Sequence, residues 1–107
     1  MIFKRLFLGL LLTAMLVQSN GQSGSLKGRL FDEQARPLAS GTIVLLNPID
    51  STLEFFAISN GSGTFEIRNI REGTYLLQAS FVGFKAFYSP LNIPRPEGSN
   101  VGDIILQ

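Results

Sequence analysis

The sequence predicts an all-β protein: a seven-stranded antiparallel β-sandwich with Greek-key connections, preceded by an N-terminal signal peptide. Short runs of apolar and β-branched residues recur along the chain, separated by turns rich in glycine, proline and asparagine. The turns come about every eight to twelve residues, which is typical of sandwiches and barrels. Within the runs apolar and polar residues alternate with a period of two, and no stretch after the leader has the period of an amphipathic helix.

The clearest alternation lies in residues 64–68 and 74–81, which are flanked by glycine turns. Two apolar side chains alternate with polar neighbours in the first stretch, and four share one face in the second. They are Phe65 and Ile67, followed by Tyr75, Leu77, Ala79 and Phe81. Two short alternating strands separated by a glycine turn are typical of tight antiparallel hairpins. We therefore expect these strands to be neighbours with one common apolar surface.

Five further strands are expected around these two. They cover residues 25–31, 41–46, 52–59, 85–91 and 102–107. Residues 41–46 are almost all apolar or β-branched, which predicts a central strand or one covered on both faces. Residues 85–91 contain Pro90, which cannot donate to a β-ladder, and this predicts an edge strand. Large aromatic side chains on apolar faces are expected in the core. These are Phe31, Phe55, Phe65 and Phe81.

The chain begins with a short basic stretch, and residues 6–17 form an apolar run broken only by one glycine and one threonine. Small residues follow, so that the pattern is that of a secretory signal peptide cleaved after Gly21. Residues 1–21 are then the signal peptide and residues 22–107 the exported domain. The alternative is a retained N-terminal membrane anchor. It is less favoured because the apolar run is short for a bilayer and its far end is small and polar.

Composition excludes several classes of function. The sequence contains neither cysteine nor histidine, so disulfides, thiolate metal sites, Ser-His-Asp triads and histidine-based metal sites are impossible. Without the two basic residues of the leader, seven basic residues stand against eight acidic ones, which gives a net charge of −1. A nearly neutral domain without a basic patch gives no reason to expect nucleic acid as a partner. No metal and no cofactor is expected.

Some polar residues resemble parts of known sites. Three carboxylate pairs are candidates for an acid and a base: Asp32 with Glu33, Asp50 with Glu54, and Glu66 with Glu72. Because they fall in turns or on the solvent faces of strands, we interpret them as surface charge. Residues 60–63 read Asn-Gly-Ser-Gly, a composition similar to that of calcium and phosphate loops. They lack the anionic ligands that calcium prefers, so we expect a turn in which Gly61 or Gly63 has positive φ.

The remaining aromatic residues are candidates for a docking patch. They are Phe56, Phe84, Phe87 and Tyr88. Phe56 lies on the face of its strand opposite to Phe55, and the other three cluster around and after the bend at Gly83. If these four side chains are exposed together, they mark a docking patch for a protein or a glycan.

The ordered set of motifs resembles a known family. It comprises residues 27–30 with 36–38, then 41–45, 50–53, 60–65, 70 with 73–77, 82–84 and 102–106. This order is similar to that of the carboxypeptidase regulatory-like domain, a transthyretin-like (prealbumin-like) sandwich of seven strands. More narrowly, it resembles the copy that follows the signal peptide in outer-membrane β-barrel proteins of the TonB-dependent receptor type in Bacteroidetes-like bacteria. The resemblance covers the chain after the leader.

The resemblance implies a non-catalytic module that precedes a plug and a barrel. The sequence ends at Gln107. We therefore interpret the chain as a truncated or a free-standing copy of the module, and we expect no transport by the chain itself. The expected location is the periplasm or the outer membrane, with no membrane-spanning segment in the mature chain. The expected partner is a protein or an outer-membrane barrel, bound by a surface or by an edge strand such as residues 85–89. The alternatives are a carbohydrate-binding module and a small transthyretin-like hydrolase, whose family active sites use histidines that this chain lacks.

Overall fold

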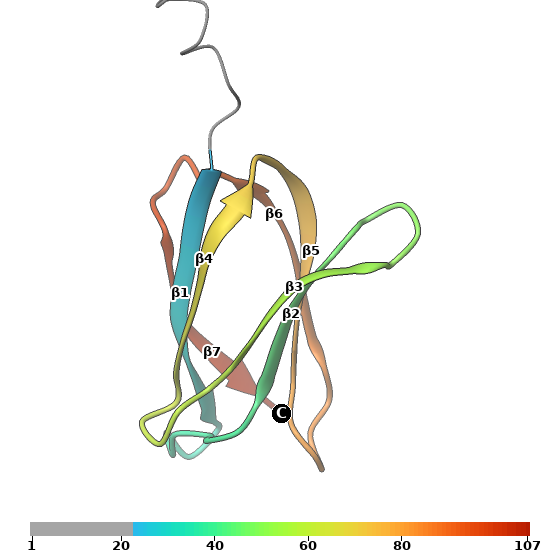
Figure 1. The fold of residues 1–107 in the computed structure, drawn as a ribbon. Helices are drawn as coiled ribbons and strands as arrows, with labels where there is room; N and C mark the ends of the chain where they lie inside the picture. The colour runs from blue at the N-terminus through green and yellow to red at the C-terminus, as the bar shows by residue number, and fades with distance from the viewer. Residues whose placement is uncertain (1–22) are drawn as a thin grey trace, which may run out of the picture.

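The computed structural model describes residues 23–107, and these form seven strands and no helix. The strands are β1 (Ser23–Asp32), β2 (Thr42–Leu46), β3 (Leu53–Ile58), β4 (Thr64–Arg71), β5 (Gly73–Ser80), β6 (Phe87–Ile93) and β7 (Asn100–Leu106). Figure 1 shows them as two layers facing each other. The predicted all-β sandwich is confirmed. The predicted signal peptide, residues 1–21, lies outside the described residues.

The strands form two sheets, one with the order β4-β1-β7 and one with the order β3-β2-β5-β6. β2 lies between β3 and β5, as its apolar sequence predicts, and β6 lies at an edge, as Pro90 predicts. All pairs are antiparallel except β1 with β7, which run parallel. No local pattern indicates this one parallel pair, because β1 and β7 are the first and the last strand of the domain.

The expectation that residues 64–68 and 74–81 form a hairpin is wrong. They belong to β4 and β5, and these strands lie in different sheets, so the chain crosses between the layers at the turn near Gly73. The predicted faces are nevertheless correct, since Phe65 and Leu77 are buried and face the same core from opposite sides. A period of two predicts which face is apolar, but it is the same whether a turn continues a sheet or leaves it.

The core between the sheets consists of aliphatic residues and a few aromatic ones. Its fully buried members are Leu26, Leu30, Ile43, Leu45, Phe65, Ile70, Leu77 and Leu106. Burial of each such side chain contributes about 1.5–3 kcal/mol. Phe55 and Phe81 pack against this cluster as predicted. Phe31 does not: it lies on the outer face of β1, where the Arg29 guanidinium is 5.2 Å from the centre of its ring.

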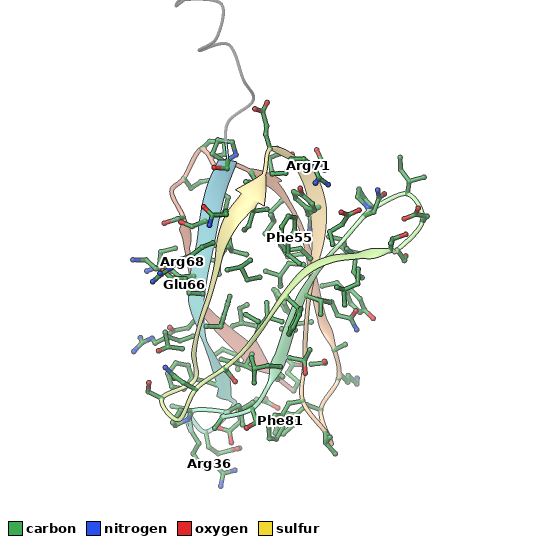
Figure 2. All side chains as sticks on the ribbon, in the orientation of Figure 1. Arg36, Phe55, Glu66, Arg68, Arg71 and Phe81 are labelled. Atoms are coloured by element: carbon green, nitrogen blue, oxygen red, sulfur yellow. The ribbon has the colours of Figure 1, made fainter. Side chains whose placement is uncertain are left out.

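Tyr75 fixes the crossover between β4 and β5. Its ring is buried, and it meets the Phe55 ring edge-to-face at 5.9 Å and 79°. Figure 2 shows Phe55 between the two layers. The Tyr75 hydroxyl donates a hydrogen bond of 2.6 Å to the backbone carbonyl of Arg71, the last residue of β4. One side chain thus joins the start of β5 to the end of β4, which resembles the tyrosine corner of immunoglobulin-type sandwiches.

Asp32 organises the turn after β1, and it is not the surface charge that we expected. Its carboxylate is buried and accepts the backbone N–H groups of Gln34 and Arg36, both at 2.9 Å. The Arg36 side chain donates a further hydrogen bond of 2.8 Å through Nε. The Arg36 N–H contributes most to lowering the pKa of Asp32 below 3.8. Burial opposes this, and the Arg36 side chain and the Gln34 N–H add to it.

The first testable prediction concerns the tyrosine corner. Replacing Tyr75 by phenylalanine keeps the packed ring but removes the bond to Arg71, so we expect the free energy of unfolding to fall by about 1 kcal/mol. Urea denaturation of the purified protein measures this difference. Tyr88→Phe is the matched control, because the Tyr88 hydroxyl belongs to an exposed side chain. Equal stabilities of the two variants would contradict the role of Tyr75.

The second prediction concerns acid stability. Because the pKa of Asp32 is lower in the folded protein, its carboxylate stabilises the fold above the ordinary value of 3.8. That stabilisation is lost as the pH falls through this value toward the folded-state pKa. Asp32→Asn is therefore expected to be less stable than the wild type at pH 7 and to lose less stability between pH 5 and pH 2. Glu33→Gln, at the exposed neighbour, is the control. An unchanged acid profile in Asp32→Asn would refute the assignment.

Candidate recognition surface

The two outer faces of the sandwich differ in charge. On the three-stranded sheet the outward side chains are largely ionic and paired with one another. Arg29 on β1 contacts Asp103 on β7 at 3.0 Å, and Arg68 contacts Glu66 on β4 at 2.7 Å. Figure 2 shows Glu66 and Arg68 on the outer side of this sheet. Exposed pairs of this kind contribute little stability and are typical of a solvated face.

The outer face of the four-stranded sheet is uncharged. Strands β2, β3, β5 and β6 contain a single charged residue, Glu54, and Arg71 of β4 holds it in an ion pair of 3.2 Å. The alternation along the four strands turns uncharged side chains outward. They include Thr42, Val44, Leu46, Phe56, Ile58, Thr74, Leu76, Gln78, Ser80, Tyr88, Pro90 and Asn92. We call this set the outer face.

One cross-strand row runs through the middle of the outer face. The strand register places Phe56 opposite Val44, Val44 opposite Gln78, and Gln78 opposite Tyr88. The two aromatic side chains at its ends are 63% and 55% exposed, whereas Val44 between them is 8% exposed. The row spans three interstrand intervals, about 14 Å. It therefore forms a platform with an aromatic side chain at each end and the polar Gln78 amide between them.

The rows on either side of this platform differ in polarity. On one side, the register brings Thr42 next to Ser80, so that two hydroxyl groups lie together, and the exposed Ile58 ends this row opposite Thr42. These residues also line a shallow depression with Phe81 and Phe84. On the other side, Leu46, Leu76 and Pro90 lie in register. The platform thus has one hydroxyl-bearing margin and one apolar margin.

The structure places only two of the four predicted docking residues on the outer face. Phe56 and Tyr88 share its central row. Phe87 pairs with Ala79, whose side chain is buried, so Phe87 points to the inner side of β6 and is 37% exposed. Phe84 packs edge-to-face on Phe81 at 5.8 Å. Sequence reasoning missed Val44 and Gln78, which complete the row, because only the strand register brings them between the aromatic residues.

The two long sides of the sandwich also differ. On one side, the ion pair of Glu54 and Arg71 joins β3 to β4. On the other side, a cavity of about 300 Å³ lies between β6 and β7, lined in part by Phe87, Leu91 and Ile104. The predicted acceptor edge, residues 85–89, overlaps only the start of β6, and Pro90 in the middle of β6 lacks an N–H for a partner strand.

The acidic side chains are engaged locally. Asp50 accepts the hydroxyl of Thr52 at 2.6 Å and its N–H at 3.0 Å, and these two bonds lower the pKa of Asp50. Glu54 and Glu66 are each paired with an arginine. Residues 23–107 contain no group of three acidic side chains placed to hold a metal ion. No helix in this part of the chain is long and apolar enough to cross a membrane.

The loop at residues 60–63 is a turn stabilised from within. The Asn60 side-chain oxygen accepts the N–H groups of Ser62 and Thr64, at 3.1 and 3.0 Å, and the hydroxyl of Ser62. Gly63 has a φ of +79°, and a Cβ there would lie 2.5 Å from the carbonyl oxygen of Leu30. This agrees with the expected turn with positive φ. The oxygen that a cation would need is already used by the turn.

Comparison with solved structures shows the same fold at low sequence identity. The Bacillus anthracis TIE protein aligns with a TM-score of 0.58 and 16% identity, over 78% of this chain and 16% of that one. Catechol 1,2-dioxygenase from Acinetobacter sp. ADP1 aligns with a TM-score of 0.55 and 12% identity, over 84% and 54%. PA1324 from Pseudomonas aeruginosa, a proposed carbohydrate-binding protein, aligns with a TM-score of 0.51 and 12% identity, over 80% and 88%. The chain thus spans less than a fifth of the TIE protein, about half of the catechol dioxygenase and most of PA1324.

No curated protein sequence matches the chain. The family comparison is positive, because residues 25–107 match the family model of the carboxypeptidase regulatory-like domain. The match begins within β1 and extends past the end of β7, so it includes both sheets. The chain therefore belongs to the carboxypeptidase regulatory-like domain family.

Proposed function

We propose that this protein is an exported, non-catalytic recognition module that binds its ligand on the outer face of the four-stranded sheet. The observation that carries the proposal is the contrast between the two outer faces. One carries paired charges beside Phe31 and Ile105, and the other exposes Phe56, Ile58 and Tyr88 without a charge among them. Exposed apolar patches on small domains mark sites of interaction. A role in recognition requires only such an exposed surface and no catalytic group.

The positions of the acidic groups support a non-enzymatic role. Acid–base catalysis needs carboxyl groups that face a cleft, one of them with a raised pKa. Here the pKa values of Asp32 and Asp50 are lowered by hydrogen bonds within their own turns. Glu54 and Glu66 are held by arginines. These carboxylates serve the fold, and the hydrolase alternative gains no support from them.

The proposed setting is the bacterial envelope. A basic start, an apolar run and small residues up to Gly21 support export. The order of motifs supports a role as the periplasmic N-terminal module of an outer-membrane protein of the TonB-dependent receptor type, or as a free-standing relative. The resemblance implies a protein or an outer-membrane barrel as the partner in that setting.

A carbohydrate ligand is the second candidate. Phe56 and Tyr88 form two exposed aromatic platforms in one row, and such platforms suit the apolar faces of sugar rings. PA1324, which shares the fold, is a proposed carbohydrate-binding protein. The fold shared with PA1324 favours a carbohydrate ligand, and the absence of histidine from the chain disfavours the hydrolase alternative.

The third prediction tests the location of the binding surface. A photo-reactive amino acid is placed at position 56 or 88 of the chain expressed in its native bacterium, and the envelope fraction is irradiated. We expect adducts, whether with protein or with polysaccharide, because these side chains lie exposed on the uncharged face. Mass spectrometry and glycan staining of the adducts identify their class.

The matched control carries the same photo-reactive residue at Ile105, which is 45% exposed and pairs with Phe31 on the opposite outer face. It is expected to give no adduct. Equal labelling from both faces would refute the proposed surface. Recovery of the protein in the cytosol with its first residue intact would refute export.

A further inference from the structure

We propose that the outer face binds an uncharged oligosaccharide chain that lies across the strands, from Phe56 to Tyr88. This inference rests on the proposed function, because it names the ligand of the same surface. First, the charge of this surface restricts the ligand. The four strands contain one charged residue, and that residue is paired at the margin. A charged polymer would lose hydration here without gaining a counter-charge, so the surface favours a neutral ligand.

The second step is the polar group in the middle of the row. The Gln78 amide lies between Val44 and Tyr88 in register and forms no side-chain hydrogen bond within the described part of the chain. An apolar protein surface laid over it would leave this amide unsatisfied, at a cost of about 1–3 kcal/mol. A sugar chain offers hydroxyl groups as partners for both the amide oxygen and the amide nitrogen. The mixture of aromatic rings and a free amide therefore favours a glycan over a protein.

The third step is length. The row from Phe56 to Tyr88 spans three interstrand intervals, about 14 Å. One sugar ring cannot contact both aromatic side chains over that distance. A chain of several rings can stack on Phe56 at one end and on Tyr88 at the other, with Gln78 bonded to a ring between them. The ligand is therefore an oligosaccharide, and its affinity is expected to rise with chain length until both platforms are occupied.

The fourth step is orientation. The hydroxyl groups of Thr42 and Ser80 lie along one side of the row, with Ile58 at the β3 end, and Leu46, Leu76 and Pro90 lie along the other. A sugar chain in the row has its polar edge toward Thr42 and Ser80. The two margins thus distinguish the two edges of the ligand.

The experiment measures binding in two stages. Affinity electrophoresis of the protein is run in gels that contain soluble neutral polysaccharides, namely a β-glucan, a mannan, a xylan and an α-glucan, or acidic ones, namely alginate and pectate. We expect retardation by at least one neutral polymer and by neither acidic polymer. Calorimetry with oligosaccharides of one to six rings from the best polymer then gives the dependence of affinity on length.

Four variants test the contributions of individual side chains to binding. Phe56→Ala and Tyr88→Ala are each expected to weaken binding by about tenfold, because each removes one stacking platform. Tyr88→Phe keeps the ring and is expected to bind like the wild type. Phe31→Ala, on the opposite outer face, is the matched control and is expected to leave binding unchanged. Because all these side chains lie outside the core, circular dichroism should show unchanged folding.

The outcomes separate this inference from the proposed function. Failure of every neutral polysaccharide to retard the protein overturns the inference, as does equal affinity for one ring and six. If photo-crosslinking at position 56 or 88 then captures a protein, the outer face remains the recognition surface and only the ligand class is wrong. If neither glycan binding nor crosslinking depends on this face, both proposals fail.

Discussion

The structure depends on holding two sheets together that share no strand pairing. Within residues 23–107 the strands pair only inside β4-β1-β7 and inside β3-β2-β5-β6. The layers are therefore held by apolar packing and by the connections between them. Side chains that bond to backbone groups fix these connections: Tyr75 at one crossover, and Ser59 at another. The buried Ser59 hydroxyl accepts the Gly41 N–H at 2.8 Å and donates to the Leu38 carbonyl at 2.6 Å.

The fold relies on this packing and on these connections all the more because the domain is small and has no covalent cross-links. A chain without cysteine has no disulfide to restrict its unfolded state. The core of a domain of this size is only just sufficient. Buried polar side chains such as Asp32 therefore contribute to the stability of the fold, because Asp32 accepts hydrogen bonds from several groups where the chain leaves β1. The result is a rigid pair of sheets whose outer faces are free to differ.

The sequence was sufficient for the strands and for most of the faces. The number of strands, the central place of β2, the edge place of β6 and the burial of Tyr75, Leu77 and Ala79 follow from local pattern. Pairing did not follow, since β4 and β5 look like a hairpin but lie in different sheets. Phe31 was expected in the core as a large aromatic residue of the first strand, but the period set by Leu26 and Leu30 turns it outward.

The candidate surface was predictable only in part for the same reason. Phe56 could be assigned to an outward face from its own strand, because Phe55 and Phe56 must point in opposite directions. Its neighbours on that face come from three other strands, and no local pattern records their register. Phe84, Phe87 and Tyr88 are close in sequence, but the alternation along β6 separates Phe87 from Tyr88, and Phe84 packs on Phe81. Of this sequence cluster only Tyr88 therefore lies in the row across the sheet.

Stability does not explain the composition of the outer face. Phe56 and Tyr88 contribute little to the core, since more than half of each side chain is exposed. An uncharged exposed sheet face also carries a risk of association between molecules. The sandwich limits that risk at its edges, where Pro90 interrupts β6 and the ion pair of Glu54 and Arg71 joins β3 to β4. Two exposed aromatic side chains that the fold does not need, on a domain that protects its edges, are best explained by a ligand that covers them.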